Sequence, residues 1–306
     1  MARQKSNRKN RSEDSHHKIH HLGNWNRWGV DDERGTLNLI SQKVVKDSVN
    51  LVRQGKIISL GLPIIHNGVD IPSFPHRLPP LHLASFAKRP DGSGTADDYV
   101  LLNTHNHTHI DSLAHDWRNG RLYNGFSLSY ITSNGAEKCG IDKIGAIVTK
   151  GVLLDIAKHK HVDSMRKGER ISAKDLLTCA KNEAVSFTEG DAVLIRTGYM
   201  SSFQKENEKS FFEGAPGLDL TTARLFDRSM SSIVGADTPF LEVVQNVRSM
   251  SWPLHTELLW MRGMSLIEML NLEELARERI YEFLFVALPL KIVGGLGSPI
   301  NPIAVY

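Results

Sequence analysis

The stretch 103-NTHNHTHIDSLAH-115 contains four of the chain's 14 histidines and one aspartate. Neutral imidazole and carboxylate groups are the side chains that hold zinc, manganese or iron near neutral pH. The apolar residues 99–102 just upstream predict a strand that enters this stretch. Alternate side chains of a strand share one face, so His105, His107, His109 and Asp111 are expected to point the same way. The pattern predicts a metal site.

The spacing of His105, His109, Asp111 and His115 is the strongest functional signal in the chain. Two imidazoles and one carboxylate leave coordination positions free for water, which is typical of a catalytic site rather than a closed structural site. A lone histidine is more often a core residue than a ligand. Four histidines and an aspartate in one short span favour a metal instead.

Composition narrows the class of protein. The chain has 306 residues, of which 41% are hydrophobic and 23% charged, an ordinary globular balance. Its formal net charge is +3, and several positive charges lie in the first eleven residues, so no nucleic-acid partner is expected. Two cysteines, Cys139 and Cys179, are too few for a disulfide framework. The sequence contains neither an apolar run of the roughly 18 residues that cross a bilayer nor a secretory signal, which predicts a cytoplasmic protein without a membrane partner.

The order of the predicted elements indicates the fold class. Residues 1–22 are basic and polar and predict a disordered tail, whose histidines at 16, 17, 20 and 21 are interpreted as solvated rather than as metal ligands. Residues 23–306 predict a single domain. Helices are predicted after Ser41 up to Gly55 and over 172–180, 221–230 and 272–280, and strands over 57–65, 146–156, 191–196, 232–236 and 283–293. Residues 72–94, rich in proline and glycine, predict a long loop. This alternation predicts an α/β fold with a mixed β-sheet core and flanking helices.

The histidine stretch also resembles a known signature, His-x-Gly-Thr-His-x-Asp-x-Pro-x-His. That signature belongs to the metal-dependent cyclase/hydrolase family, which includes bacterial kynurenine formamidase and isatin hydrolase. The residues that match are His105, Thr108, His109, Asp111 and His115. The residues that depart from it are His107, in place of glycine, and Leu113, in place of proline.

Further stretches carry the same resemblance from about residue 25 to the C-terminus. They are Trp28-Gly29 with Asp31-Asp32-Glu33 and Gly35-Thr36-Leu37-Asn38, Gly151–Asp155, Gly190-Asp191 with Arg196-Thr197-Gly198, and Gly297–Pro302. The resemblance implies a swivelling β/β/α-like fold, a small-molecule substrate and a homo-oligomer.

The resemblance also implies roles for individual residues. His105, His109 and Asp111 would be metal ligands, and His115 the general acid/base or a hydrogen-bonding partner of the metal-bound water. His255 and Glu268 match a later histidine and glutamate that complete a second metal site, with Asp111 bridging two ions. Without the resemblance, this pair would be interpreted as a surface histidine and a helix-start carboxylate. The expected cofactor is zinc or manganese, as one or two ions.

Two residues are predicted to bind substrate or to support the ligands. On a regular strand His107 would share the ligand face, but a histidine bonded to backbone or carboxylate is preferred over an extra ligand. Asp237 follows the predicted strand 232–236 and is placed near the site, with ordinary turn chemistry as the alternative.

The implied activity is hydrolysis of a small amide, either an aryl formamide or a cyclic amide, by water that the metal activates. A lactonase, an esterase or a ring-forming cyclase on the same metal site is the first alternative, because ester and amide carbonyls need the same electrophilic help. A metal-binding family member without catalytic activity is the second. A panel of substrates and the metal content separate the three.

Overall fold

The protein is described here by a computed structural model of residues 23–65, 77–201 and 211–306. The predicted tail 1–22 and its four histidines lie outside these ranges. The α-helices are α2 (Gln42–Val49), α3 (Ile156–His159), α4 (Ala173–Asn182), α6 (Thr221–Ser229), α7 (Pro253–His255) and α8 (Glu273–Glu278), and η7 (Thr256–Met261) is a π-helix that follows α7 directly. The 3₁₀ helices are η1 (Gly35–Leu39), η2 (Tyr123–Gly125), η3 (Leu128–Tyr130), η4 (Ile141–Lys143), η5 (Phe211–Glu213) and η6 (Val247–Ser249).

The strands form one large sheet and three small ones. They are β1 (Ile57–Ser59), β2 (Leu81–Lys88), β3 (Gly94–Leu101), β4 (His109–Asp111), β5 (Ile131–Thr132), β6 (Gly135–Ala136), β7 (Ile147–Asp155), β8 (Arg170–Ile171), β9 (Ala192–Arg196), β10 (Gly217–Leu218), β11 (Ile233–Ala236), β12 (Leu266–Glu268), β13 (Glu282–Ala287), β14 (Gly297–Pro299) and β15 (Ile303–Val305). The large sheet has nine strands in the order β1-β15-β13-β7-β9-β11-β12-β4-β14.

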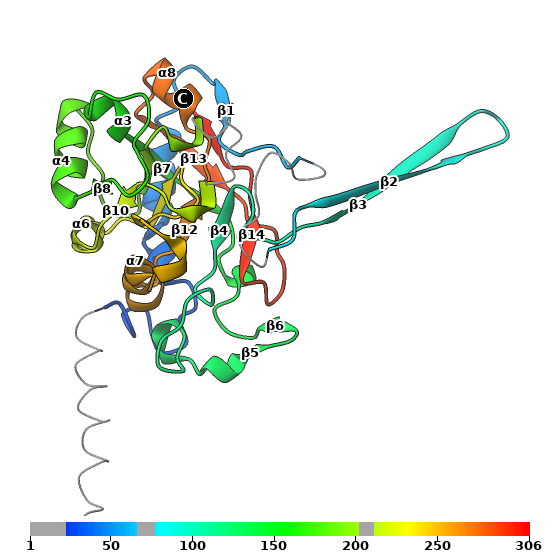
Figure 1. Ribbon diagram of the computed structural model, residues 1–306, viewed down its shortest axis with the longest axis horizontal. Helices are drawn as coiled ribbons and strands as arrows, with labels where there is room; N and C mark the ends of the chain where they lie inside the picture. The colour runs from blue at the N-terminus through cyan, green and yellow to red at the C-terminus, as the bar shows by residue number, and fades with distance from the viewer. Residues whose placement is uncertain (1–22, 66–76, 202–210) are drawn as a thin grey trace, which may run out of the picture.

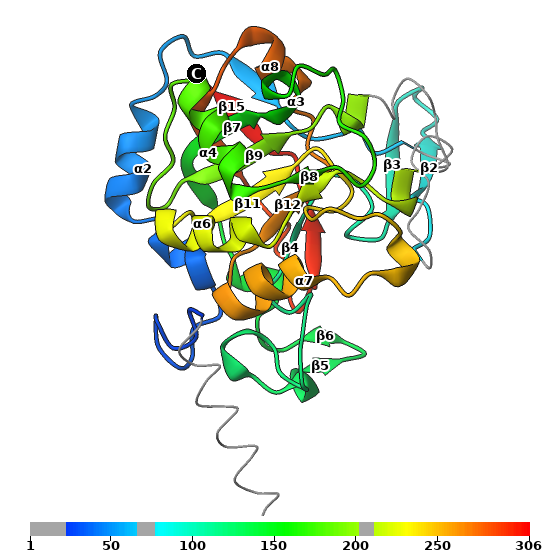
Figure 2. The ribbon, with the colours of Figure 1, turned by 60° about the vertical axis from the view of Figure 1, so that its left-hand side comes forward.

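This sheet is mixed, as predicted. Neighbours from β7 through β12 run parallel, whereas the pairs on either side of this block are antiparallel. The sheet curls into a half-barrel with helices along it, and α4 and α6 lie together beside the parallel strands (Figures 1 and 2). The α/β class with a mixed sheet and flanking helices is therefore confirmed.

The parallel centre of the sheet is buried on both faces, which explains its apolar strand sequences. Val152 and Leu154 of β7 pack into the core cluster that includes α4 and α6, whereas Leu153 packs into the cluster on the opposite face with Phe283. Burial of one such leucine contributes about 1.5–3 kcal/mol. Gly151 is the register partner of Phe283, and a Cβ at Gly151 would lie 2.2 Å from the Phe283 ring. The glycine interruption of β7 thus makes room for a core aromatic.

Two predicted helix starts, at Ser41 and Ser172, are confirmed by their caps. The Ser41 hydroxyl accepts the Val44 N–H at the start of α2, and Ser172 and Asp175 form a reciprocal capping box on α4. Such caps contribute about 1 kcal/mol each. No helix in the described ranges is both long enough and apolar enough to span a membrane.

Four sequence predictions of local structure are wrong. Residues 72–94 are not a long loop in their described part, because 81–88 form β2, which pairs with β3 in a hairpin that projects from the body (Figure 1). The predicted strands 57–65 and 283–293 end early, at Ser59 and Ala287, since Gly61, Pro63 and Pro289 follow.

The fourth error concerns the approach to the histidines. No strand runs from 99 into Asp111: β3 ends at Leu101, and β4 begins only at His109. Between them the chain turns, because the Asn106 N–H donates to the Asn103 carbonyl and the His105 N–H donates to the Asn103 side chain. The histidines therefore do not share a face through strand alternation.

Candidate metal centre

Short strand β4 places His109 and Asp111 in the sheet, between β12 and β14. Thr108 fixes the entry to this strand, since its hydroxyl donates to the Met269 carbonyl and accepts the Leu62 N–H. Gly297 of β14 lets the His105 ring approach, because a Cβ at this position would lie 2.5 Å from His105 Nε2. The loop before β4 and the strand itself thus bring both histidines to Asp111.

The first group of possible ligands comprises His105, Asp111 and His115. His105 Nε2 lies 3.3 Å from Asp111 Oδ1. The His115 ring stacks on the His105 ring with centroids 4.2 Å apart. One ligand atom from each residue lies within 4.8 Å of the others, which is a spacing that a single cation can span.

The second group comprises His109, Asp111 and Glu268, and it shares Asp111 with the first. His109 Nε2 lies 3.5 Å from both Asp111 Oδ1 and Glu268 Oε2. On the far side of Glu268, its Oε1 lies 3.4 Å from His255 Nε2. The structure therefore brings His255 and Glu268 of the distant part of the chain to the histidine stretch.

Unsatisfied polar atoms concentrate where the two groups meet. Both carboxylate oxygens of Asp111 and the Nε2 of His105 are buried without a hydrogen bond in the described part of the chain. Buried polar atoms are normally hydrogen-bonded, and a bare buried carboxylate is costly. Imidazole nitrogens and carboxylate oxygens are the donor set that zinc and manganese take. The residues present therefore fit a divalent cation on Asp111.

Hydrogen bonds orient the remaining histidines. The Nδ1 of His109 bonds to the His107 carbonyl at 2.6 Å, so its Nε2 faces the carboxylates. The Nδ1 of His255 bonds to Glu242 Oε1 at 2.7 Å, so its Nε2 faces Glu268. Metal-bound histidines commonly use the second nitrogen in this way.

The buried histidines of the centre differ in the direction in which their pKa is shifted. Burial lowers the pKa of His105 well below its ordinary value, and His115 and His109 lower it further. Burial likewise lowers the pKa of His115, which keeps its ring neutral. Burial also disfavours the His255 cation, but hydrogen bonds to Glu242 and Glu268 outweigh it and raise the His255 pKa. Burial alone would raise the pKa of Glu268; His109 and His255 hold it below its ordinary value.

Two charged residues near the metal centre, Glu242 and Arg77, belong to no sequence motif, and the sequence did not predict them as site residues. The Glu242 carboxylate accepts hydrogen bonds from the N–H groups of Leu254 and His255, and it also bonds to the His255 ring. Arg77 donates to the His105 carbonyl at 2.6 Å; burial lowers the pKa of Arg77, and the charges of Glu268 and Asp111 oppose this shift only in part. Neither has a sequence neighbour among the ligand candidates, so only the tertiary structure identifies them.

Neither of the two predicted supporting residues belongs to a ligand group, although the His107 carbonyl bonds to His109 Nδ1. His107 lines an apolar groove of about 690 Å³ together with Leu62, Ile64 and Ile300. The Asp237 carboxylate accepts the Thr197 N–H and hydroxyl and the Gly198 N–H. Asp237 belongs to neither ligand group, and its hydrogen bonds join the ends of β9 and β11.

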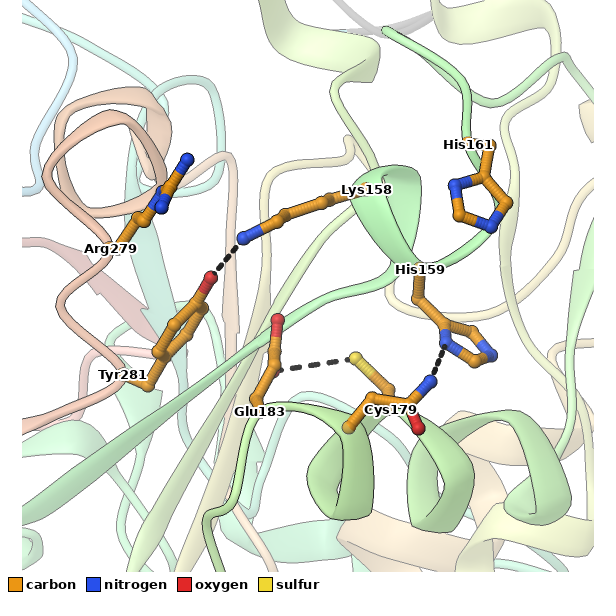
Figure 3. Close-up of a pocket in the computed structure, with 8 residues that line it drawn as sticks. Lys158, His159, His161, Cys179, Glu183, Arg279 and Tyr281 are labelled. Carbon is orange, nitrogen blue, oxygen red and sulfur yellow. Dashed lines mark hydrogen bonds between the residues drawn. The ribbon is translucent and has the colours of Figure 1, made fainter.

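A separate cleft of about 460 Å³ lies at the end of β7 (Figure 3). Its side chains bond mainly to one another: Lys158 donates to the Tyr281 hydroxyl at 2.5 Å, and the Cys179 thiol donates to Glu183. Burial raises the pKa of Glu183 to about 7. None of its lining residues belongs to either ligand group.

Comparisons with known proteins cover most of the chain. The family model Cyclase, described as "Putative cyclase", matches residues 41–243. A solved structure described as a novel cyclase is 34% identical, with 94% of this chain and 99% of that chain covered and a TM-score of 0.86. Isatin hydrolase A from Labrenzia aggregata, bound to benzyl benzoate, is 22% identical, with 86% and 97% covered and a TM-score of 0.60.

A further structure has the same fold at low identity. It is described as a predicted metal-dependent hydrolase from Bacillus stearothermophilus and is 20% identical, with 81% of this chain and 97% of that chain covered and a TM-score of 0.52. No curated protein matches the chain significantly.

Proposed function

The chain belongs to the Cyclase family, and on that premise we propose that it is a metal-dependent hydrolase of a small amide. The observation that carries the proposal is the Asp111 carboxylate, which is fully buried, has no hydrogen bond in the described part of the chain and lies 3.3 Å from His105 and 3.5 Å from His109. Such a carboxylate is tolerated where a cation compensates it.

The substrate class is an aryl formamide or a cyclic amide. Two observations support this choice: the family to which the chain belongs, and the isatin hydrolase and metal-dependent hydrolase descriptions of proteins with the same fold. Isatin is a cyclic amide, and a formamide presents the same kind of carbonyl to a nucleophile. The partner of the site is therefore a small molecule.

Five residues hold the metal in this proposal: His105, His109, Asp111, His255 and Glu268. Asp111 lies between the two groups and is the residue that two ions would share. Zinc or manganese bound there supplies Lewis-acid chemistry, which acidifies water and polarises a carbonyl. Glu242 fixes the His255 ring, and the Leu241 N–H holds Glu268 by a bond of 2.8 Å to Oε1.

His115 is the proton carrier. Its ring stacks on His105 and lies near Asp111, and burial keeps it neutral by lowering its pKa. A neutral imidazole accepts a proton from the attacking water and returns it to the leaving nitrogen, which contributes about 10²- to 10⁴-fold to the rate. The buried surroundings of the ligands exclude bulk water and strengthen these charge interactions.

A substrate panel tests the proposal. The protein is assayed against an aryl formamide, an isatin-like ring and a lactone, before and after removal of metal by chelation. We expect hydrolysis of an amide that chelation abolishes and added zinc or manganese restores. Turnover of the lactone alone would favour a lactonase or esterase, and bound metal without turnover of any carbonyl substrate would favour a non-catalytic metal-binding protein. Amide hydrolysis that survives chelation would contradict the proposal.

A further inference from the structure

The cleft at the end of β7 has three walls that come from separate parts of the chain (Figure 3). One wall is α3 with the turn after it, the second is the end of α4, and the third is the segment between α8 and β13. The lining residues of the three walls are, in this order, Lys158, His159 and His161; Cys179, Asn182 and Glu183; and Arg279 and Tyr281. The volume of about 460 Å³ lies within the range of about 300–1,000 Å³ that small-molecule sites have.

Two cations of this cleft have no carboxylate partner. In the described ranges, neither Lys158 nor Arg279 lies within ion-pair distance of an aspartate or glutamate. Two acids of the adjoining elements are bound elsewhere: Asp155, which precedes α3, and Glu273, which begins α8, each contact Arg196 at 2.8 Å. The charges of Lys158 and Arg279 are therefore not balanced by an ion pair.

Glu183, the acid among the lining residues, offsets this charge only in part. Its Oε1 accepts the Asp155 N–H at 3.2 Å, and its Oε2 accepts the Cys179 thiol at 3.4 Å, so both oxygens are already bound. Burial raises the pKa of Glu183 to about 7, which leaves a large part of these carboxyl groups uncharged at neutral pH. The cleft therefore has a net positive charge.

The cationic end of the cleft offers more hydrogen-bond donors than acceptors. Lys158 reaches across to the Tyr281 hydroxyl, to which its Nζ donates at 2.5 Å (Figure 3). Since ammonium and guanidinium groups each have several N–H donors and no acceptor, Lys158 and Arg279 retain donors for a ligand. The Tyr281 oxygen already accepts from Lys158, so its own hydrogen is available to another acceptor. Ionised carboxylate and phosphate oxygens are acceptors of this kind.

We propose that this cleft binds a small molecule that carries a carboxylate or phosphate group, through Lys158, Arg279 and Tyr281. The guanidinium group of Arg279 binds two oxygens of such an anion side by side, a geometry that a planar fork of donors favours. Lys158 and Tyr281 donate to the same anion from their hydrogen-bonded pair. The site is separate from the metal centre, because none of these residues belongs to either ligand group.

A metal ion is the other ligand that the residue types of the cleft suggest, since cysteine, histidine and glutamate all bind zinc. In the described ranges, however, the cleft contains no three such ligand atoms within 4.8 Å of one another, as the two groups around Asp111 do. Burial also raises the pKa of the Cys179 thiol, whereas a metal ligand has to be a thiolate. The arrangement therefore favours an anion over a cation.

Equilibrium dialysis of the full chain as purified tests the proposal, with radiolabelled benzoate and radiolabelled inorganic phosphate as separate probes. The cleft variant Lys158→Gln/Arg279→Gln is compared with the control Lys181→Gln/Arg277→Gln, which removes the same charge. Lys181 on α4 and Arg277 on α8 are exposed and do not line the cleft. We expect saturable binding of at least one probe, at least about tenfold weaker in the cleft variant because charge-assisted hydrogen bonds are lost. The control should bind like the natural protein.

The same comparison separates the cleft from the metal centre, because a probe molecule bound at the metal stays bound in the cleft variant. The relative affinities of benzoate and phosphate identify which of the two anions the cleft prefers.

Glu183→Gln provides a readout in the opposite direction, which loss of the fold cannot imitate. At pH 8 this variant should bind the preferred probe more tightly than the natural protein, because a negative charge beside the anion has been removed. No saturable binding of either probe would overturn the proposal. So would undiminished binding in the cleft variant, an equal loss in the control, or the absence of a gain in Glu183→Gln.

Discussion

His109 on β4 is the register partner of Glu268 on β12, and its Nε2 lies 3.5 Å from Glu268 Oε2. This pairing joins the histidine stretch to a glutamate far along the chain, because β4 and β12 are neighbours in the sheet. Asp111 follows two residues later, on the same face of β4. The sheet thus sets the distance between the two carboxylates of the centre.

Asp111→Asn separates the metal function from the stability of the fold. We expect the variant to lose its metal. Its activity should fall by more than the roughly 10- to 100-fold loss that follows removal of a group that only supports a ligand. In chelated protein, however, the variant should be about 1 kcal/mol more stable, because it removes a buried charge that lacks hydrogen bonds. Elemental analysis and thermal unfolding measure the two effects. A variant that keeps its metal would remove Asp111 from the ligand set.

His115→Ala separates proton transfer from metal binding. We expect turnover to fall about 10²- to 10⁴-fold while metal content stays near that of the natural protein. The pH dependence of the remaining activity should also change, since a group that titrates has been removed. Loss of metal in this variant would instead make His115 a ligand, which the group His105, Asp111 and His115 also permits.

His255→Ala tests the second ion, with His107→Ala as a matched control. Both histidines are buried. His255 lies 3.4 Å from Glu268, whereas His107 lines the groove and belongs to neither ligand group. If two ions are bound, metal analysis by mass spectrometry should show the loss of one ion per chain in His255→Ala and no change in His107→Ala. Equal metal content in the two variants would exclude His255 as a ligand.

Glu183→Gln tests a pH effect away from the metal centre. Burial raises the Glu183 pKa from 4.5 to about 7, so the folded state binds a proton that the unfolded chain releases. The protonated Glu183 side chain therefore stabilises the folded state fully below pH 4.5, and this stabilisation is lost as the pH rises through about 7. The variant should therefore match the natural protein at low pH and exceed it by about 1 kcal/mol at pH 8, a value reduced for solvent screening. Urea unfolding at both pH values measures this; an equal difference at both would contradict it.

The sequence predicts the sheet centre and the helix caps because these depend on local patterns. The apolar run of β7 and the serines before α2 and α4 encode their own structure within a few residues. The strand predicted at 99–102 is confirmed as the end of β3, whereas β2 and the start of β3 escaped prediction. Every residue of both strands is exposed, so no core imposes a pattern of burial on them.

The candidate site was predictable only from its residue types and from its resemblance to a known signature. The prediction that His105 to Asp111 converge because they share one strand face is wrong, since the chain turns at Asn103–Asn106 before β4. The histidines converge through loop geometry and the β4–β12 pairing, which no local pattern encodes. Glu242 and Arg77 depend on tertiary contacts in the same way.

The most direct test is anomalous diffraction from crystals of the full chain loaded with zinc or manganese. We expect an anomalous peak in contact with the Asp111 carboxylate and with His105 or His109, and a second peak, if two ions bind, between Asp111, Glu268 and His255. A peak only at the N-terminal histidines, or metal-loaded crystals in which Asp111 touches no metal, would contradict the account.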